Sequence, residues 1–259
     1  VTINTENITL KGPNAGIAPT SDDRDQAPEA TIEGQIDVSA ANVTVDGVEV
    51  SPSTETFTDT PAAAIIVTES SATVQNTRVG DFNIDITDID ANSIQGIQVY
   101  ESGEKLTDID IEDNLVENIT YEGSDEGLSG SFGEDYGNIY AIHIQGQIGE
   151  ATVESNTIRD LRSDGYIPGV AVSGTDSNED ANPENVVIVE NTLTEFSASG
   201  APATGVTISG DPVDVSRVTV TRNNLDVPLD IDNKASEPLN AQLNYFGGGL
   251  SIRGNVAFD

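Results

Sequence analysis

The sequence contains no cysteine, methionine or tryptophan and only three lysines, Lys11, Lys105 and Lys234. Without cysteine the chain can form no disulfide, no thiolate metal site and no cysteine nucleophile. Ten Lys and Arg stand against 45 Asp and Glu, a formal net charge of −35 that excludes the basic surface needed for nucleic-acid binding. No apolar run approaches the roughly 20 residues of a membrane-spanning helix, so we expect no span in this segment.

The acidic residues are spread along the whole chain and are not gathered in one tail. A surface this acidic repels itself in dilute buffer. At about 1 M salt the Debye length falls to roughly 3 Å, and most of that repulsion is screened. The pattern resembles that of proteins from extreme halophiles, especially haloarchaea, and predicts unfolding at low salt. A merely acidic secreted protein is the alternative.

β-Branched residues dominate the apolar set. Ile and Val together number 49 against 11 Leu, a bias that favours strands. Ile, Val, Leu and Phe make up 66 of the 259 residues, above the roughly one-fifth that is typical of disordered chains. No linker is visible, so we expect one folded all-β domain over residues 1–259.

One short pattern recurs along the chain: an apolar residue, two positions of any kind, Asn, one more position and a second apolar residue. Degenerate copies are marked by Asp46 and Asn76. Successive marks lie 21 to 42 residues apart, which predicts one coil per mark with loops inserted between strands. The clear copies centre on Asn114, Asn156, Asn191, Asn223 and Asn244.

A second element precedes each Asn. It reads small–apolar–x–apolar, as in Gly96-Ile-Gln-Val99 and Ala141-Ile-His-Ile144. This period of two is typical of a strand with one buried face. The insertions over 121–137 and 175–185 are rich in Gly, Ser, Asn and acids, a composition that indicates loops.

Together with Val43-Thr-Val-Asp-Gly47 near the start and Asn244-Tyr-Phe-Gly-Gly248 near the end, these repeats make the chain resemble the right-handed parallel β-helices of the pectate-lyase-like superfamily. The resemblance implies an all-β, single-stranded solenoid of about seven to nine coils, stacked about 4.8 Å apart. Asn at the same corner of successive coils would adopt a tight, left-handed turn and bond to the Asn above and below, forming a buried ladder.

The ends of the sequence add an expectation. The chain starts at a strand, Val1-Thr-Ile3, and stops at Phe258-Asp259, where members of the superfamily usually continue. We therefore expect one or both end caps to be missing, in a fragment or a processed chain. An uncovered coil end exposes unpaired sheet edges, which would pair with other chains or domains.

The catalytic signatures of the superfamily are not visible. Pectate-lyase-type elimination would need clustered Asp for calcium with an Arg or Lys base, and polygalacturonase-type hydrolysis would need Asn-Thr-Asp, Asp-Asp and Gly-His-Gly. Asp22-Asp23 is the only Asp-Asp pair, and the single histidine, His143, stands between two isoleucines. We assign no catalytic residue, and we expect the arginines near the Asn turns to counter nearby acids. A polysaccharide lyase, hydrolase or epimerase remains the alternative function.

An outward stripe near His143 is the candidate binding face. With Ile142 and Ile144 inward, His143 points out of the coil, level with Gln98, Ala171 and Thr207. Flanked by the 121–137 loop, this stripe would bind a glycan by ring stacking and hydrogen bonds. The alternative is an exposed histidine on a solvated face. The candidate glycan-binding residues are Gln98, Tyr100, Tyr121, Tyr136, His143 and Gln145.

Two further kinds of site are candidates. Asp176, Asn178 and Asp180 place oxygen ligands at alternate positions, as calcium loops do, and would hold Ca²⁺ or Mg²⁺. The glycine and distal Glu of an EF-hand are missing, and a solvated acidic loop is the alternative. Sequons are candidate glycosylation sites and support a secreted location; they lie at Asn7, Asn42 and Asn118.

The sequence thus favours a structural or adhesive module of a halophilic archaeon, located outside the cell or on its surface, in a surface protein, filament subunit or virus fibre. The expected partners are further copies of the chain, other surface-protein domains and glycans. A carbohydrate-binding module without catalysis is the third possibility, after the enzyme.

Overall fold

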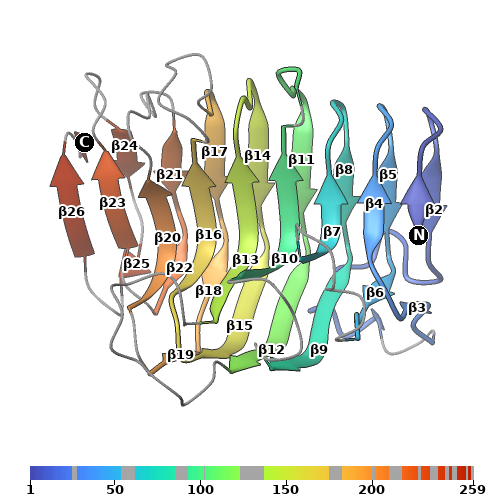
Figure 1. Cartoon of the computed structure of the whole chain (residues 1–259), viewed down its shortest axis with the longest axis horizontal. Coiled ribbons are helices and arrows are strands. Elements are labelled where there is room, and N and C mark those ends of the chain that lie inside the picture. The colour runs from blue at the N-terminus through green and yellow to red at the C-terminus, as the bar shows by residue number, and fades with distance from the viewer. Residues whose placement is uncertain are drawn as a thin grey trace.

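The structure, a computed structural model, consists of three parallel β-sheets that wind around one core (Figure 1). It describes residues 1–24, 28–53, 62–85, 93–101, 103–122, 137–174, 183–199, 202–209, 218–226, 229–233, 239–242, 245–246, 250–254 and 256–257.

Each sheet has nine strands, and the chain visits the sheets in turn, so that neighbouring strands of a sheet come from successive coils. Sheet A contains β1 (Thr2–Ile3), β4 (Ile36–Val38), β7 (Ala63–Val67), β10 (Ser93–Tyr100), β13 (Asn138–Gln145), β16 (Ile167–Ser173), β20 (Ala203–Ser209), β23 (Leu229–Asn233) and β26 (Leu250–Gly254). Sheet B contains β2 (Thr9–Lys11), β5 (Thr44–Asp46), β8 (Thr73–Gln75), β11 (Ile109–Glu112), β14 (Ala151–Glu154), β17 (Val186–Val189), β21 (Thr219–Thr221), β24 (Leu239–Gln242) and β27 (Val256–Ala257).

Sheet C contains β3 (Thr31–Ile32), β6 (Glu49–Val50), β9 (Arg78–Asp85), β12 (Leu115–Glu122), β15 (Thr157–Ser163), β18 (Thr192–Leu193), β19 (Phe196–Ala198), β22 (Asn224–Leu225) and β25 (Tyr245–Phe246). The strands β18 and β19 both pair with β15. Every pairing in the three sheets is parallel, and this arrangement confirms the predicted parallel β-helix.

The core is a set of aliphatic columns that run from coil to coil. Ile97 is level with Ile65 on one side and with Ile142 on the other, and Ile142 is level with Val170. All four side chains are fully buried. Burying a side chain of this size contributes roughly 1.5–3 kcal/mol, and β-branched residues suit the pleated surface, so the Ile and Val bias follows directly from the fold.

The small residue at the start of the second element lies where two strands approach closely. A Cβ added to Gly96 would lie 2.5 Å from the carbonyl oxygen of Ala141, and one added to Gly169 would lie 2.7 Å from that of Gly205. A larger side chain at either position would push neighbouring coils apart. The sequence pattern therefore reports a close approach between strands of sheet A.

Three corners of the coil use left-handed backbone. The non-glycine residues there have φ between 46° and 61°, and most are Asn or Asp, which tolerate this conformation best. The corner before sheet B has Asn7, Asn42, Ser71, Asp108 and Asn185; the corner between sheets B and C has Asn76, Asp113, Ser155, Glu190 and Arg222; the bend within sheet C has Asp81, Asn118, Asp160 and Glu195.

An asparagine ladder fills the corner between sheets B and C. The Oδ1 of Asn156 accepts the backbone N–H and the Nδ2 of Asn114, both at 3.0 Å, and Nδ2 of Asn156 donates to Ile111 O and Asn191 Oδ1. Asn191 and Asn223 repeat the same bonds in the next coils. These asparagines are at most 1% exposed.

Two details of the expected ladder are wrong. The left-handed residue is the one before each ladder asparagine, such as Asp113 or Ser155, because the asparagine itself must turn its amide along the stack. Asp46 and Asn76 are also out of register: Asp46 is level with Gln75, and Thr77, whose N–H donates to Asn114 Oδ1, follows Asn76. Asn244 lies outside the described residues.

The first coils solve the same corner with charges. Asp46 Oδ1 accepts from Asn76 Nδ2 and from the N–H of Gly16, both at 2.9 Å. Arg24, only 5% exposed, donates to the carbonyl of Asn76 and forms an ion pair with Glu29. The 12–24 segment thus closes the corner ahead of the first ladder asparagine.

Candidate functional site

The outer face of sheet A carries a group of polar side chains over β10, β13 and β16, which we call the outer polar cluster: Gln95, Gln98, Tyr140, His143, Gln145 and Ser173. They point outward because the alternate residues of the same strands point into the core. His143 is level with Gln98 and Ala171, as expected, and Gln145 is level with Tyr100 and Ser173.

His143 connects three strands. Its Nδ1 lies 3.1 Å from Gln95 Oε1 in β10, and its Nε2 lies 2.8 Å from Ser173 Oγ in β16. Gln95 precedes the level of His143 and Ser173 follows it, so the three lie on a diagonal across neighbouring strands, within reach of long side chains. Ala171, level with the ring, presents only a methyl group and leaves the path to Ser173 open.

These contacts fix the protonation of the ring. Gln95 Oε1 can only accept, so Nδ1 carries the hydrogen and Nε2 accepts the hydroxyl hydrogen of Ser173. The ring is stacked on Tyr140 with centroids 4.6 Å apart. Burial lowers the pKa of His143 to about 4, so the imidazole is neutral at pH 7.

A second pair of amides lies beside His143. Gln98 Nε2 donates to Gln145 Oε1 at 3.3 Å. Gln98 is 2% exposed, and its Oε1 is buried without a hydrogen-bond donor. Gln145 is half-buried, and its amide nitrogen has no partner among the residues that the structure describes.

The predicted glycan-binding residues therefore differ in their surroundings. His143 is 7% exposed and Gln98 is buried, so the exposed histidine of the solvated-face alternative is wrong. Tyr121 is fully buried in the core, which corrects its expected place on the outer surface. Tyr100 and Gln145 are half-buried at the C-terminal ends of their strands. Tyr136 lies outside the described residues.

Sequence reasoning missed Gln95, Tyr140 and Ser173. Each occupies an outward position of a sheet A strand, and the alternation of apolar residues could have placed them on the same face as His143. The diagonal contacts could not be read from that alternation, because they depend on the offset between coils, which the inserted loops conceal.

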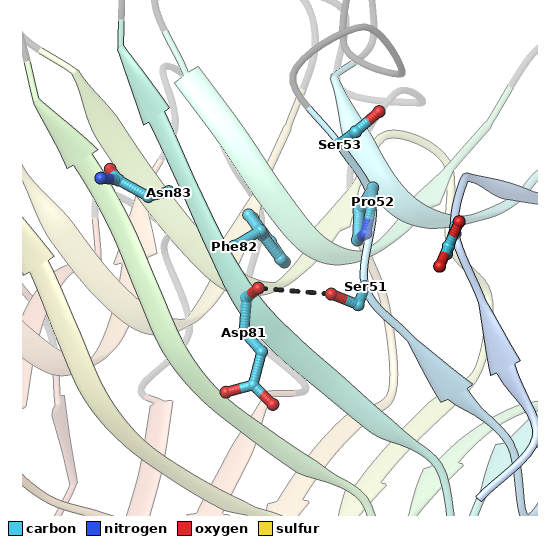
Figure 2. A pocket seen from close by; sticks show the side chains of 7 residues that line it. Ser51, Pro52, Ser53, Asp81, Phe82 and Asn83 are labelled. Atoms are coloured by element: carbon cyan, nitrogen blue, oxygen red, sulfur yellow. Dashed lines mark hydrogen bonds between the residues drawn. The ribbon is translucent and has the colours of Figure 1, made fainter.

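A separate pocket of about 440 Å³ lies where β9 meets the segment after β6 (Figure 2). Its buried members are Pro52 and Phe82, and the polar ones are Glu33, Ser51, Ser53, Asp81 and Asn83. Figure 2 shows the Asp81 carboxylate turned away from Pro52 and Ser53. It is held by Arg78 at 2.6 Å and by Asn118 Nδ2 at 2.8 Å.

The acidic surface has some local compensation on sheet C. Arg78 bridges Glu49, Asp81 and Glu117, and Arg159 contacts the other oxygen of Glu117. On sheet B, burial together with the neighbouring carboxylate of Asp108 raises the pKa of Asp110. Glu112 is raised in the same way by burial and by its acidic neighbours.

The predicted cation loop, with Asp176, Asn178 and Asp180, lies outside the described residues. Within the part of the chain that the structure describes, no group of three or more His, Asp or Glu is placed to hold a metal ion. Ca²⁺ or Mg²⁺ in that loop stays a prediction.

The three sequons coincide with corners. Asn7 and Asn42 stand at the corner before sheet B and Asn118 at the bend within sheet C, all with left-handed backbone. The coil itself requires a residue that tolerates φ > 0, then an inward apolar residue, then an outward one, and Asn-Ile-Thr or Asn-Val-Thr satisfies that order. The sequons therefore have a structural origin in the coil, and their glycosylation stays a prediction.

Comparison with family models, with curated proteins and with solved structures gives no significant match. Among the described residues no helix is long and apolar enough to cross a bilayer.

Proposed function

We propose that the chain is an extracellular structural or adhesive module, a stiff rod on the surface of a halophilic archaeon, in a surface protein, filament or virus fibre. The observation that carries this proposal is the unbroken stacking of three nine-stranded sheets. Parallel ladders, aliphatic columns and the asparagine ladder all run along one axis, so each coil is supported by both of its neighbours.

The charge supports the habitat. A net charge of −35 destabilises the compact state by self-repulsion in dilute buffer, and molar salt removes that penalty. A place in the pectate-lyase-like superfamily is part of the same proposal, supported by the coil architecture and by the ladder corner.

Light scattering and negative-stain imaging at molar salt test the rod. Rods joined end to end, or bundled filaments, are the expected result. A strictly monomeric particle at every concentration would overturn assembly. Thermal unfolding followed by circular dichroism from 4 M to 0.05 M NaCl tests the habitat, and a melting temperature independent of salt would contradict it.

Glycan binding is the second candidate function, and the pocket of Figure 2 favours it. Pro52 and Phe82 offer apolar surface, and hydroxyl, amide and carboxylate groups surround them. Sugar-binding sites combine these two features, and the volume lies within the usual range of about 300–1,000 Å³.

A panel of neutral and amino sugars, titrated at molar salt, tests this candidate. Asn83→Ala should weaken binding if the pocket is used, and Tyr100→Ala should weaken it if the outer face near His143 is used. No saturable binding to any member of the panel would remove this candidate.

A further inference from the structure

We propose that Ser173 is a nucleophile for acyl transfer, with His143 as its general base, Gln95 as the residue that positions the imidazole and Gln145 as an oxyanion donor. The substrate class is an uncharged ester with a small acyl group, such as an O-acetyl ester. This activity is independent of the structural role proposed above.

The first support is the direction of the hydrogen bonds. Ser173 Oγ donates to Nε2 of His143 at 2.8 Å, and Nδ1 donates to Gln95 Oε1 at 3.1 Å. A nucleophile bonded to a base, whose far nitrogen is held by an acceptor oxygen, is the arrangement of serine hydrolases. The neutral imidazole at pH 7 is the form that accepts a proton.

The second support is the place of Gln145. It is level with Ser173 on the neighbouring strand, and its oxygen is already engaged by Gln98 Nε2. That bond leaves the amide nitrogen of Gln145 beside the serine. Side-chain amides serve as oxyanion donors in other acyl-transfer sites.

The third support is access. Ser173 and Gln145 are half-buried at the ends of β16 and β13, whereas His143 and Gln95 are buried behind them. A small acyl group can reach the hydroxyl while the base stays dry. The charge of −35 selects against anionic esters.

The reaction balances with water alone. Ser173 Oγ bonds to the acyl carbon as its proton passes to His143 Nε2, and the alcohol leaves with that proton when the C–O bond breaks. Water then attacks the acyl-serine and gives a proton to Nε2, and Ser173 recovers a proton as the acid leaves. Gln95 is neutral and stabilises the imidazolium less than a carboxylate would, so we expect slow turnover.

The test is acylation by 4-nitrophenyl acetate at molar salt, with the modified serine identified by peptide mass spectrometry. Ser39 is the matched control, because it is similarly half-buried but donates only to the carbonyl of Ile3. We expect Ser173 to be labelled on the order of 10²-fold faster than Ser39. Equal labelling of the two serines in the unmodified chain would overturn the proposal, and this comparison needs no variant.

Variants then assign the roles. His143→Gln should reduce labelling of Ser173 to the level of Ser39, and Gln145→Leu should slow it at least about tenfold. Gln95→Leu should slow it while Gln95→Glu, which keeps an acceptor oxygen, should restore it, a difference that a purely structural role would not produce. Labelling of Ser173 that is unchanged in a folded His143→Gln chain would contradict the proposal.

Discussion

The asparagine ladder and the outer polar cluster are both buried and polar, yet they are built on opposite rules. In the ladder one residue type repeats, and each amide from Asn114 to Asn191 donates to one neighbour and accepts from the other. In the outer polar cluster the residue changes at every coil, and Gln98 Oε1 is buried without a donor. Repetition marks a structural solution that serves each coil equally, whereas its breakdown marks a place where selection acted on one coil.

Breaking the ladder in its middle should give the largest effect. Asn156→Ala removes four hydrogen bonds and leaves the N–H and Nδ2 of Asn114 and the carbonyl of Ile111 buried and unpaired. Each such group costs about 1–3 kcal/mol, so we expect a loss of about 4 kcal/mol of unfolding free energy. Denaturant titration at molar salt measures it.

The exposed Asn224 provides the control for that measurement. Asn224→Ala should change the unfolding free energy by less than about 0.5 kcal/mol. A similar small value for Asn156→Ala would show that the ladder does not stabilise the coils.

Protonation of His143 should give the next largest effect. Its pKa is about 4 in the folded chain and near 6.5 when unfolded, so the unfolded state binds the proton first. Stability contributed by the neutral ring is fully present above pH 6.5 and falls as the pH drops toward 4, by about 3 kcal/mol in total. Below pH 4 this loss is complete.

The measurement is the difference in unfolding free energy between pH 7 and pH 4.5, compared with that of His143→Gln. The comparison is needed because the raised pKa values of Asp110 and Glu112 act in the opposite direction, stabilising the fold as the pH falls. An identical pH dependence in the two chains would show that the ring is solvated.

Removing the buried orphan oxygen should give the smallest effect. Gln98→Leu deletes an acceptor that has no donor, and it frees the half-buried Gln145 to bond to water. We expect a change within about 1 kcal/mol, in contrast to the ladder. A loss as large as that of Asn156→Ala would mean that Gln98 holds an ordered water that is part of the structure.

The sequence predicts the fold well because every coil repeats the same demands. Alternating apolar residues place Ile97 and Ile142 in the same column, and the Asn spacing identifies the corner. The misplacement of Asp46 and Asn76 arose because the first coils fill that corner with Asp46, Asn76 and Arg24, and a search for asparagine cannot detect a charged substitute.

The candidate site is less predictable, for a physical reason. Alternation indicates that His143 points out of the coil, but it does not indicate whether the outer face is covered, and both His143 and Gln98 proved to be buried. Tyr121 was assigned to the surface from its place beside a loop, whereas its strand turns the ring inward. Contacts between non-adjacent coils, such as His143 with Ser173, depend on loop lengths that carry no repeating signal.

The one-directional bonding of the ladder has an evolutionary consequence. Asn156 receives from Asn114 and donates to Asn191, so a duplicated coil inserted between any two ladder coils would find a donor on one side and an acceptor on the other. The length of the rod is therefore free to change by whole coils through duplication within the gene. Coils that already carry a specialised outer face, such as those of β10, β13 and β16, would be the ones least open to such copying.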